Sequence, residues 1–358
     1  MAEIEFFKIL SFRNLEEVEV KVEAPFLCFY GQNAQGKTNI LESLYLVSNI
    51  RSFRSGNTSD WIMHGKKQSK VLFGAKDDIS RFTMGYEVNR GFRDYFIDDK
   101  QIKSIRELIE RVRIIAYSPS SYELILGDDS ERRAFFDKVV YSMDTKHLED
   151  VVYYNKALKN RNAALKLGKD YHIWDAFLAT SGERIIARRL KAITLMQEYF
   201  KDTFALFFGG EGKLDFVYKP SAGVTASDIK LKLEKDSRND EIRQTTSHGP
   251  HRDHIYIMLN GRDAKSTVST GQAKLIAFLF KIAKVRFIKE FSGKKPIFLY
   301  DDVSAFLDEK RLCQLVEIIK KEDVQILSSS VDNNLFRTLF SDSVQFITVR
   351  EGRVDNGG

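Results

Sequence analysis

The sequence contains few of the residues that mark extracellular, disordered or membrane-spanning chains. Its two cysteines, Cys28 and Cys313, are isolated within apolar segments, so they offer neither a disulfide framework nor a CxxC metal site. Five prolines and the lack of low-complexity runs argue against long disordered linkers. No apolar run approaches the ~20 residues that span a bilayer, and the start, MAEIEFFKIL, lacks the pattern of a secretory signal. We therefore expect a cytoplasmic protein without a membrane partner.

Basic residues only slightly outnumber acidic ones. The 358 residues include 56 basic and 50 acidic ones, for a net charge of +6. This balance allows a phosphate-rich partner without requiring one, because basic residues bind nucleic acid only where they cluster. Three clusters occur, KNRNAALKLGK (159–169), ARRLK (187–191) and RSFRSG (51–56). Each is equally explained by a solvated helix face or loop.

Hydrophobic patterning predicts strands in the first part of the chain. EVEVKVE (17–23) is typical of an exposed strand, and the wholly apolar FLCFY (26–30) of a strand covered on both faces. A glycine-bounded loop and a helix from Lys37 follow. Residues 70–100 alternate between apolar runs and turn residues, which predicts an antiparallel meander, and VRIIAYS (112–118) predicts another buried strand.

The rest of the chain is predicted to contain a helical block and a second α/β region. Residues 130–207 have helical periodicity, but the block is too short and irregular for a long coiled-coil arm. A charged stretch at 234–243 is expected to be weakly structured. The final third alternates helix and strand, which is typical of a parallel sheet. We expect an α/β head formed by 1–125 and 245–358, with a mainly helical lobe at 126–244.

The segment GQNAQGKT fits the phosphate-loop pattern G-x-x-x-x-G-K-[ST] in full. Two glycines let backbone amides curl around phosphate oxygens, and the N-terminus of the following helix adds positive potential. The alternative, a simple glycine turn, is less favoured because the loop lies between a buried strand and an amphipathic helix. Lys37 is expected to reach the β- and γ-phosphates, and the Thr38 hydroxyl to bind Mg²⁺. The expected nucleotide contacts are Gly31, Gln32, Asn33, Ala34, Gln35, Gly36, Lys37 and Thr38.

Two adjacent acids follow the apolar strand PIFLY. Asp301 and Asp302 would lie at its carboxyl end, where open α/β sheets bind ligands. Alone, such a pair is as easily a turn. With a phosphate loop present, Asp301 is expected to hold Mg²⁺ directly or through water, and Asp302 to orient or deprotonate the attacking water.

The segment STGQ opens a strongly apolar helix between these two motifs. Taken singly it is an ordinary N-cap, but the order phosphate loop, STGQ, paired acids resembles ABC-type ATPase heads. In such heads this segment faces a nucleotide held by a second subunit. The resemblance implies that Ser269, Gly271 and Gln272 cover the ATP of a partner chain, and that SAFLD (304–308) is a D-loop at the same interface.

Three further stretches resemble one family, the bacterial recombination mediator RecF. They are FRNL (12–15), YSPSSYELILGDDSERRAFFD (117–137) and SHGPHRDHI (247–255), and the resemblance extends over essentially the whole chain. It implies an ABC-type ATPase head, a mixed sheet with a phosphate loop and an antiparallel meander, plus a compact helical lobe and no long coiled coil. It also implies that Arg13 and Asn14 lie near the base or ribose of the nucleotide.

The chain departs from the family pattern at several positions. His254 follows Asp253 where a second acid is usual, and Phe306 replaces an acid in the D-loop. The strand after the paired acids ends in serines instead of a switch histidine, so Ser329 or Ser330 is expected to sense the γ-phosphate. The lid near Tyr117 has no clear glutamine.

Two basic or histidine-rich motifs keep more than one interpretation. The three histidines of SHGPHRDHI suggest a metal site, but their spacing around Gly-Pro does not hold them on one face of a helix or strand. A polar loop near nucleotide or DNA is therefore favoured, and Arg252 is a candidate phosphate contact. Arg132 and Arg133 are expected either to face DNA or to pair with nearby acids.

The resemblance implies a weak, Mg²⁺-dependent and DNA-stimulated ATPase. ATP would close a homodimer that binds duplex and gapped DNA mainly through phosphate contacts. Slow hydrolysis would then reopen the dimer. RecR, RecO and the RecA recombinase are the implied partners, with RecA being loaded on single-stranded gaps.

Three alternatives remain open at this stage. The motor subunit of an ABC transporter usually has the switch histidine that is missing here. A nuclease of the overcoming-lysogenisation type requires an appended acidic metal domain. A non-hydrolysing DNA clamp would differ from the enzyme in its ATP turnover with and without duplex DNA.

Overall fold

The computed structural model describes residues 2–49, 51–54, 56–89, 91–208, 212–302, 309–331, 337 and 343–355. The chain forms two compact units, one made of Met1–Ser121 with Gly293–Gly358 and the other of Tyr122–Ser292. The sequence-based division placed 245–292 in the ATPase head, whereas these residues belong to the second unit. The reason is the long helix α10 (Thr270–Ser292), which packs against other helices of that unit, α4 and α6.

The first unit contains an antiparallel sheet with the strand order β2-β1-β4-β5-β6-β7. The predicted meander supplies four of these strands, and the two N-terminal strands extend the same sheet, since β1 pairs with both β2 and β4. Alternating burial along β2 reflects one face on the core and one in solvent. The strands are β1 (Glu3–Phe12), β2 (Leu15–Lys21), β4 (Gln68–Lys76), β5 (Arg81–Asn89), β6 (Arg93–Ile97) and β7 (Lys100–Gln101).

The second sheet of this unit joins both ends of the chain, as predicted. Its order is β15-β14-β3-β13-β12-β8, and all neighbours pair in parallel except β15 with β14. The strands are β3 (Phe26–Tyr30), β8 (Ile114–Tyr117), β12 (Ile297–Tyr300), β13 (Ile326–Ser330), β14 (Val344–Arg350) and β15 (Arg353–Asp355). β8, β12 and β13 are buried along their whole length, which explains the continuous apolar character of β8 and β12, whereas β13 ends in three buried serines.

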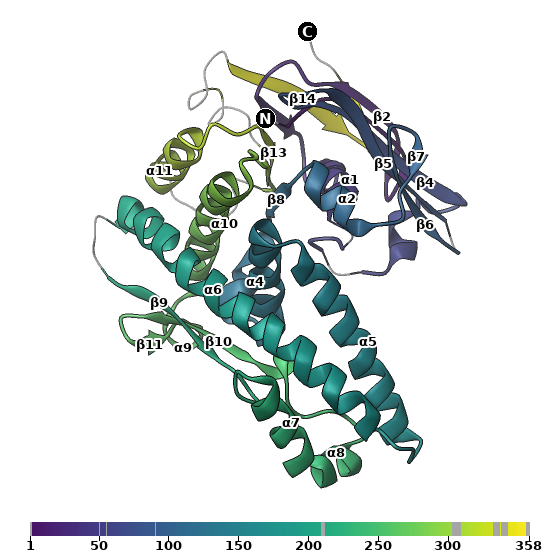
Figure 1. Ribbon diagram of the computed structural model, residues 1–358. Helices are drawn as coiled ribbons and strands as arrows, with labels where there is room; N and C mark the ends of the chain where they lie inside the picture. The colour runs from purple at the N-terminus through teal and green to yellow at the C-terminus, as the bar shows by residue number, and fades with distance from the viewer. Residues whose placement is uncertain are drawn as a thin grey trace. The chain divides into compact units, whose positions relative to one another are not determined.

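Helices of the first unit complete its core. The helix α1 (Lys37–Ser48) contacts β1, β4, β5, β8 and β13, so it lies between the two sheets (Figure 1). Buried aromatic and aliphatic side chains from both sheets and from α1 form one continuous cluster. The remaining short elements are α2 (Ile105–Arg111), α11 (Glu309–Lys320), and the 3₁₀ turns η1 (Thr58–Trp61) and η2 (Pro119–Tyr122).

The second unit is mainly helical. Its longest helix, α6 (Asp175–Phe208), packs against α5 (Lys146–Lys166), α7 (Ala226–Lys235), α4 (Asp129–Met143) and α10 (Figure 1). A small sheet with the order β11-β10-β9 completes the unit. Its other elements are α3 (Glu123–Leu126), η3 (His172–Trp174), β9 (Leu214–Lys219), α8 (Ser237–Arg243), η4 (Pro250–Arg252), β10 (His254–Leu259), β11 (Arg262–Asp263) and α9 (Ala264–Thr267).

One local expectation was wrong. The charged stretch 234–243 is helical in its larger part, because α8 covers Ser237–Arg243 directly after α7. The N-terminus of α7 has a capping box formed by Thr225 and Asp228, and α8 is fixed by buried Asp240, which pairs with Arg161 of α5. None of the helices in the described part of the chain is both long and apolar enough to cross a bilayer.

Candidate nucleotide-binding site

The loop between β3 and α1 has the backbone shape of a phosphate cradle. Gly31, Ala34 and Gly36 have positive φ angles of 149°, 63° and 114°. A Cβ atom at Gly31 would lie 2.4 Å from the Val349 carbonyl oxygen, and one at Gly36 would lie 2.8 Å from a methyl of Leu15. Glycine is therefore required at both positions by conformation and by space.

The Lys37 side chain lies inside this loop. Its ammonium group donates hydrogen bonds to the carbonyl oxygens of Gly31 and Gln32, at 2.7 and 2.8 Å. Burial lowers the pKa of Lys37, and the nearby carboxylates of Asp302 and Asp301 oppose that shift. The cation is thus held at the mouth of the loop by weak carbonyl acceptors, which phosphate oxygens can replace.

Thr38, Asp301 and Ser329 meet at the carboxyl ends of β12 and β13. The two strands pair in parallel, with Tyr300 opposite Ser328, so the next residue of each lies at the same sheet edge. The Thr38 hydroxyl donates to Oδ1 of Asp301 at 2.8 Å, and the Ser329 hydroxyl donates to the same oxygen at 2.7 Å. Burial raises the pKa of Asp301, while the hydrogen bonds from Ser329 and Thr38 oppose this rise.

The donor set at this edge fits a hard divalent cation. Mg²⁺ prefers carboxylate and hydroxyl oxygens and keeps several waters. Asp301 and Thr38 supply one oxygen of each kind within hydrogen-bonding distance of each other. The backbone amide of Asp302 donates to the Ser329 hydroxyl at 2.8 Å, so the second acid is anchored through the same serine.

A hollow of about 690 Å³ opens over these groups. Its volume lies within the ~300–1,000 Å³ range of small-molecule sites. Of the expected nucleotide contacts in the first unit, Arg13, Gly31 and Gln32 are not in its wall. The lining residues are Asn14, Asn33, Ala34, Gln35, Gly36, Lys37, Thr38, Asn39, Arg54, Ser118, Pro119, Ser120, Asp301, Asp302 and Ser329.

Several lining residues were missed at the level of sequence. Arg54 belongs to the basic cluster RSFRSG, which gave no indication of which arginine would face the loop. Ser118 and Ser120 follow β8, whose carboxyl end lies beside that of β12. Their position after a buried parallel strand was the available signal. Of the two serines proposed to sense the γ-phosphate, Ser329 lines the hollow and Ser330 does not.

Arg13 is directed to a buried carboxylate of α1. Its guanidinium donates two hydrogen bonds to Glu42, each 2.7 Å long, and the side chain of Glu42 is fully buried. Glu42 also accepts from the Ser52 hydroxyl at 2.6 Å and pairs with Arg54 at 3.4 Å. Arg54 in turn donates to Asn39 at 2.7 Å. Glu42 therefore connects Arg13 with an arginine that faces the hollow.

The C-terminal hairpin supports the phosphate loop. The carbonyl oxygen of Gln35 accepts from the amide of Gly352 at 2.8 Å, and its side-chain oxygen accepts from the amide of Glu351 at 2.6 Å. Gln35 thus combines a place in the wall of the hollow with an attachment to the turn between β14 and β15.

The STGQ segment lies in the second unit and is exposed. Ser269 and Gln272 form a reciprocal pair at the start of α10. The backbone amide of Gln272 donates to the Ser269 hydroxyl at 3.2 Å, and the backbone amide of Ser269 donates to the side-chain oxygen of Gln272 at 2.9 Å. This geometry is a capping box, and Gly271 lies between its members in open space apart from the serine hydroxyl. The expected D-loop, 304–308, lies outside the described residues.

SHGPHRDHI is built into the second unit. His251 contacts the Tyr154 hydroxyl at 2.7 Å, and burial lowers the pKa of His251 to about 4. His248 and His254 instead contact Asp236 and Asp129, at 2.7 and 2.6 Å. The three histidines therefore do not converge, and the described residues contain no cluster of three or more histidines, cysteines or acids suited to a metal ion.

The other residues of this motif and the Arg-Arg pair also bond mostly to groups within the protein. Asp253 is fully buried and accepts from the Ser221 amide at 2.8 Å. Arg132 is buried and pairs with Asp129 at 3.1 Å, and Arg133 donates to the carbonyl oxygen of Asp253 at 2.7 Å. Of the two interpretations of Arg132, the structure shows the ion pair. Arg252 is exposed.

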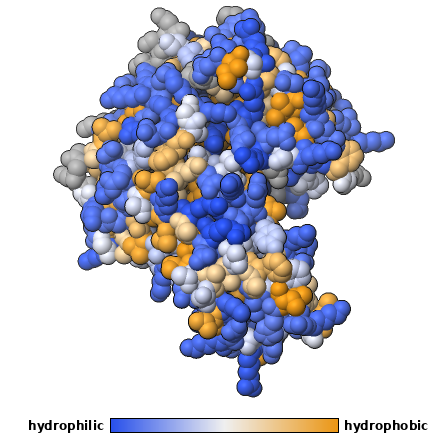
Figure 2. Space-filling model, in the orientation of Figure 1, coloured by the Kyte–Doolittle hydropathy of each residue, from blue (hydrophilic) through white to orange (hydrophobic). Residues whose placement is uncertain are grey.

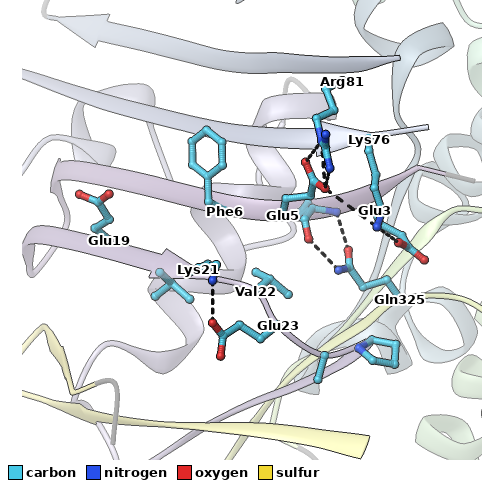
Figure 3. Close-up of a pocket in the computed structure, with 14 residues that line it drawn as sticks. Glu3, Glu5, Phe6, Glu19, Lys21, Val22, Glu23, Lys76, Arg81 and Gln325 are labelled. Carbon is cyan, nitrogen blue, oxygen red and sulfur yellow. Dashed lines mark hydrogen bonds and ion pairs between the residues drawn. The ribbon is translucent and has the colours of Figure 1, made fainter. Parts of the chain in front are cut away.

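A larger hollow, of about 1,040 Å³, lies elsewhere in the first unit and shares no residue with the phosphate-loop hollow. Its three cations are each paired with a glutamate (Figure 3). The amide of Gln325 bonds to both backbone groups of Ile4, which holds β1 against β13. The ion pairs are Lys21–Glu23, Lys76–Glu3 and Arg81–Glu5. This hollow lacks the loop and the unshared cation that a triphosphate requires.

Comparison with known families gives one match that spans nearly the whole chain. Residues 3–355 match the model of the RecF/RecN/SMC N terminal domain. The DNA replication and repair protein RecF of Geotalea daltonii is 31% identical over 355 residues, which cover 96% of this chain and 97% of that protein. The protein of the same name from Myxococcus xanthus is also 31% identical, over 96% of this chain and 94% of that protein.

Solved structures give the same match. A structure of the recombination mediator protein RecF with ATP superposes with a TM-score of 0.89 at 26% identity, over 99% of this chain and 97% of that chain. The Smc head domain of Pyrococcus furiosus, at 17% identity and a TM-score of 0.57, shares the fold alone. The predicted fold class, an ABC-type head with a helical lobe, is confirmed.

Proposed function

Because this chain belongs to the RecF family of DNA replication and repair proteins, we propose that it is an ATP-dependent DNA-binding protein with a slow, Mg²⁺-dependent ATPase activity. The observation that carries the proposal is the meeting of Lys37, Thr38, Asp301 and Ser329 at one end of the parallel sheet. A phosphate loop with a hydroxyl and a carboxylate beside it is the arrangement that a nucleoside triphosphate and its metal need.

Each residue of the site has a chemical role in this proposal. Lys37 exchanges its carbonyl acceptors for the β- and γ-phosphate oxygens, while the backbone amides of the loop donate hydrogen bonds to the other phosphate oxygens. Thr38 and Asp301 would hold Mg²⁺, which would supply positive charge beside the phosphates. Asp302 orients or deprotonates the attacking water, and Ser329 senses the γ-phosphate in place of a switch histidine. Asn14 and Arg54 complete the wall around the nucleotide.

The STGQ segment has its role in a second copy of the chain. Its exposed hydroxyl and helix N-terminus form a ready anion site. We infer that Ser269, Gly271 and Gln272 cover the γ-phosphate of the partner's ATP. ATP binding then closes a homodimer on duplex or gapped DNA, and hydrolysis releases it. Structures of RecF described as part of the RecFOR pathway support RecR and RecO as partners, with RecA loading as the outcome.

Sedimentation with ADP, ATP and a short duplex tests this proposal. Wild type should dimerise only with ATP. Lys37→Met should lose nucleotide binding, because the cation in the loop is gone. Ser269→Arg should bind ATP and stay monomeric, because the arginine obstructs the shared site. Normal ATP-dependent dimers of Ser269→Arg would disprove the shared-nucleotide mechanism.

A further inference from the structure

The three basic clusters of the sequence differ in how many of their charges are paired with acids in the folded chain. In ARRLK, Arg188 pairs with Asp144 at 2.7 Å, and Arg189 pairs with Asp137 at 2.8 Å. These arginines join elements of the second unit to one another. Their charge is neutralised internally, so Lys191 is the one basic residue of this cluster that remains exposed for an external anion.

The cluster RSFRSG is partly used in the same way. Arg54 binds Asn39 and Glu42 and lines the nucleotide hollow, so its charge belongs to that site. In KNRNAALKLGK, Arg161 is fully buried and pairs with Asp175 and Asp240, each at 2.7 Å. The lysines of this third cluster remain.

Two of those lysines, Lys159 and Lys166, lie on the outer face of α5, and Lys156, which precedes the cluster by one turn, lies on the same face. Lys156, Lys159 and Lys166 are exposed, and none has an ion pair with any residue in the described part of the chain. On a helix with 100° per residue, the three fall within an arc of about 80°. The buried residues of α5 lie on the opposite side, with Tyr154, Ala157, Arg161 and Leu165 facing the core of the unit.

The spacing of this lysine face suits a phosphate backbone. The rise of 1.5 Å per residue places Lys166 about 15 Å along the axis from Lys156. From Val152 to Leu167 the exposed positions of α5 contain no acid. Duplex DNA carries about one charge per 1.7 Å of its axis, so several phosphates lie within reach of such a face. The drawn surface around α5, α7 and α8 is mainly hydrophilic with separate small apolar patches (Figure 2), which suits a wet, phosphate-binding surface.

We propose that the exposed face of α5, formed by Lys156, Lys159 and Lys166, binds the sugar–phosphate backbone of duplex DNA. The inference rests on the proposed function, since it names where DNA contacts the helical unit. The contacts carry no base readout, because lysine is a flexible point charge on a long stem. The face acts by charge, so its contribution is measured by salt dependence.

The test compares duplex binding by the full chain, with Mg²⁺ and ATP, at a series of salt concentrations. In the triple variant Lys156→Gln, Lys159→Gln, Lys166→Gln, the slope of log affinity against log salt should fall by about 2.7, since each phosphate contact contributes about 0.9. Between 50 and 200 mM salt the wild type should therefore lose ~40-fold more affinity than the variant. Glutamine is as good a helix former as lysine, so α5 should remain folded.

A matched control removes three lysines whose charge is already paired. It carries Lys201→Gln, Lys213→Gln and Lys230→Gln, whose partners are Glu198, Asp215 and Glu234. The net charge falls equally, yet the slope should stay within about one unit of wild type. Replacing the α5 lysines by arginine should also preserve it.

The outcomes separate the two proposals. Wild type that binds no DNA contradicts the proposed function. Wild type that binds DNA while both glutamine variants have its slope contradicts only the α5 assignment, and leaves the face to an acidic protein. An equal decrease of the salt slope in both glutamine variants would mean that only net charge matters, and it would contradict the α5 assignment too.

Discussion

Glu42 is the charged residue whose loss should disturb the site most without touching the nucleotide. Its carboxylate is fully buried on α1, one turn after Thr38, and it receives two bonds from Arg13 and one from Ser52. Glu42→Gln keeps the shape of the side chain and removes its charge. The guanidinium of Arg13, whose side chain is 17% exposed, then lacks a counter-ion.

The cost can be bounded from this geometry. Removing one partner of a buried ion pair costs about 3–5 kcal/mol. Arg13 keeps some contact with water, and the glutamine oxygen can still accept one bond. We therefore expect the lower limit, a loss of about 3 kcal/mol in the free energy of unfolding of the first unit. Arg13→Met should cost a similar amount because it leaves Glu42 buried and unpaired.

Urea unfolding followed by tryptophan fluorescence measures this loss. The chain has two tryptophans, of which Trp61 is in the first unit and 3% exposed, with its carbonyl oxygen bonded to the amide of Arg13. In a Trp174→Phe background, Trp61 reports on the first unit alone. Because the two single changes remove one interaction, the double variant should be more stable than their sum predicts, by about 2–3 kcal/mol.

The control and the refuting result come from the same assay. Glu19→Gln removes the partner of Lys8 in an ion pair whose side chains are 60% and 49% exposed, and it should cost at most about 1 kcal/mol. Single changes at Glu42 and Arg13 that add within about 0.5 kcal/mol would refute the idea that this pair is a coupled unit. A third result also bears on function: Glu42→Gln should weaken ATP binding, because Arg54 loses its carboxylate partner.

Three further changes test other parts of the molecule. Ser329→Ala removes a hydroxyl bonded to Asp301 and should weaken Mg²⁺-dependent binding of a fluorescent ATP analogue about tenfold, whereas Ser328→Ala should not; equal affinities would contradict a sensing role. Gly36→Ala forces a side chain into φ 114° and should lower the unfolding free energy by about 1–3 kcal/mol, measured by thermal melting. The pKa of His251 is about 4 in the folded chain, below its ordinary 6.5, so between these values the unfolded chain binds an extra proton. The free energy of unfolding should therefore fall by up to about 3 kcal/mol from pH 7 to 4 in urea titrations. His251→Gln should flatten this pH dependence.

The phosphate loop, its flanking elements and the paired acids were predictable because their signals are local. FLCFY is β3 residue for residue, and the helix begins at Lys37, where the motif places it. The contribution of strands from both chain ends to one sheet followed from the alternation of the final third. That Ser329 bonds to Asp301 was not predictable, because it depends on which face of β13 points to that carboxylate.

The SHGPHRDHI motif marks the limit of inference from composition. Its histidines and arginine suggested a polar loop near nucleotide or DNA. Asp253 is nevertheless buried, and Gly249 has a φ of 127° with so little space that a Cβ atom there would lie 2.3 Å from the Tyr154 hydroxyl. The segment is fixed by contacts with Ser221 and Asp236 and with helices more than fifty residues away in sequence, among them Tyr154 of α5. Polar residues that neutralise one another inside a fold have the same composition as those that bind an external ligand.

The basic clusters show why charge counts alone cannot locate a binding surface. Arginine presents a planar fork that matches a carboxylate with two bonds, so it tends to be used inside or between elements, as Arg161 and Arg189 are here. Lysine keeps its ammonium group strongly hydrated and stays at the surface on a flexible stem. A mixed cluster therefore divides on folding: its arginines become structural, and its lysines remain as the charge that a phosphate can meet. On this argument α5, whose arginine is buried and whose lysines are exposed, is a stronger candidate for the DNA surface than ARRLK, although ARRLK has three basic residues in five positions and is the denser cluster.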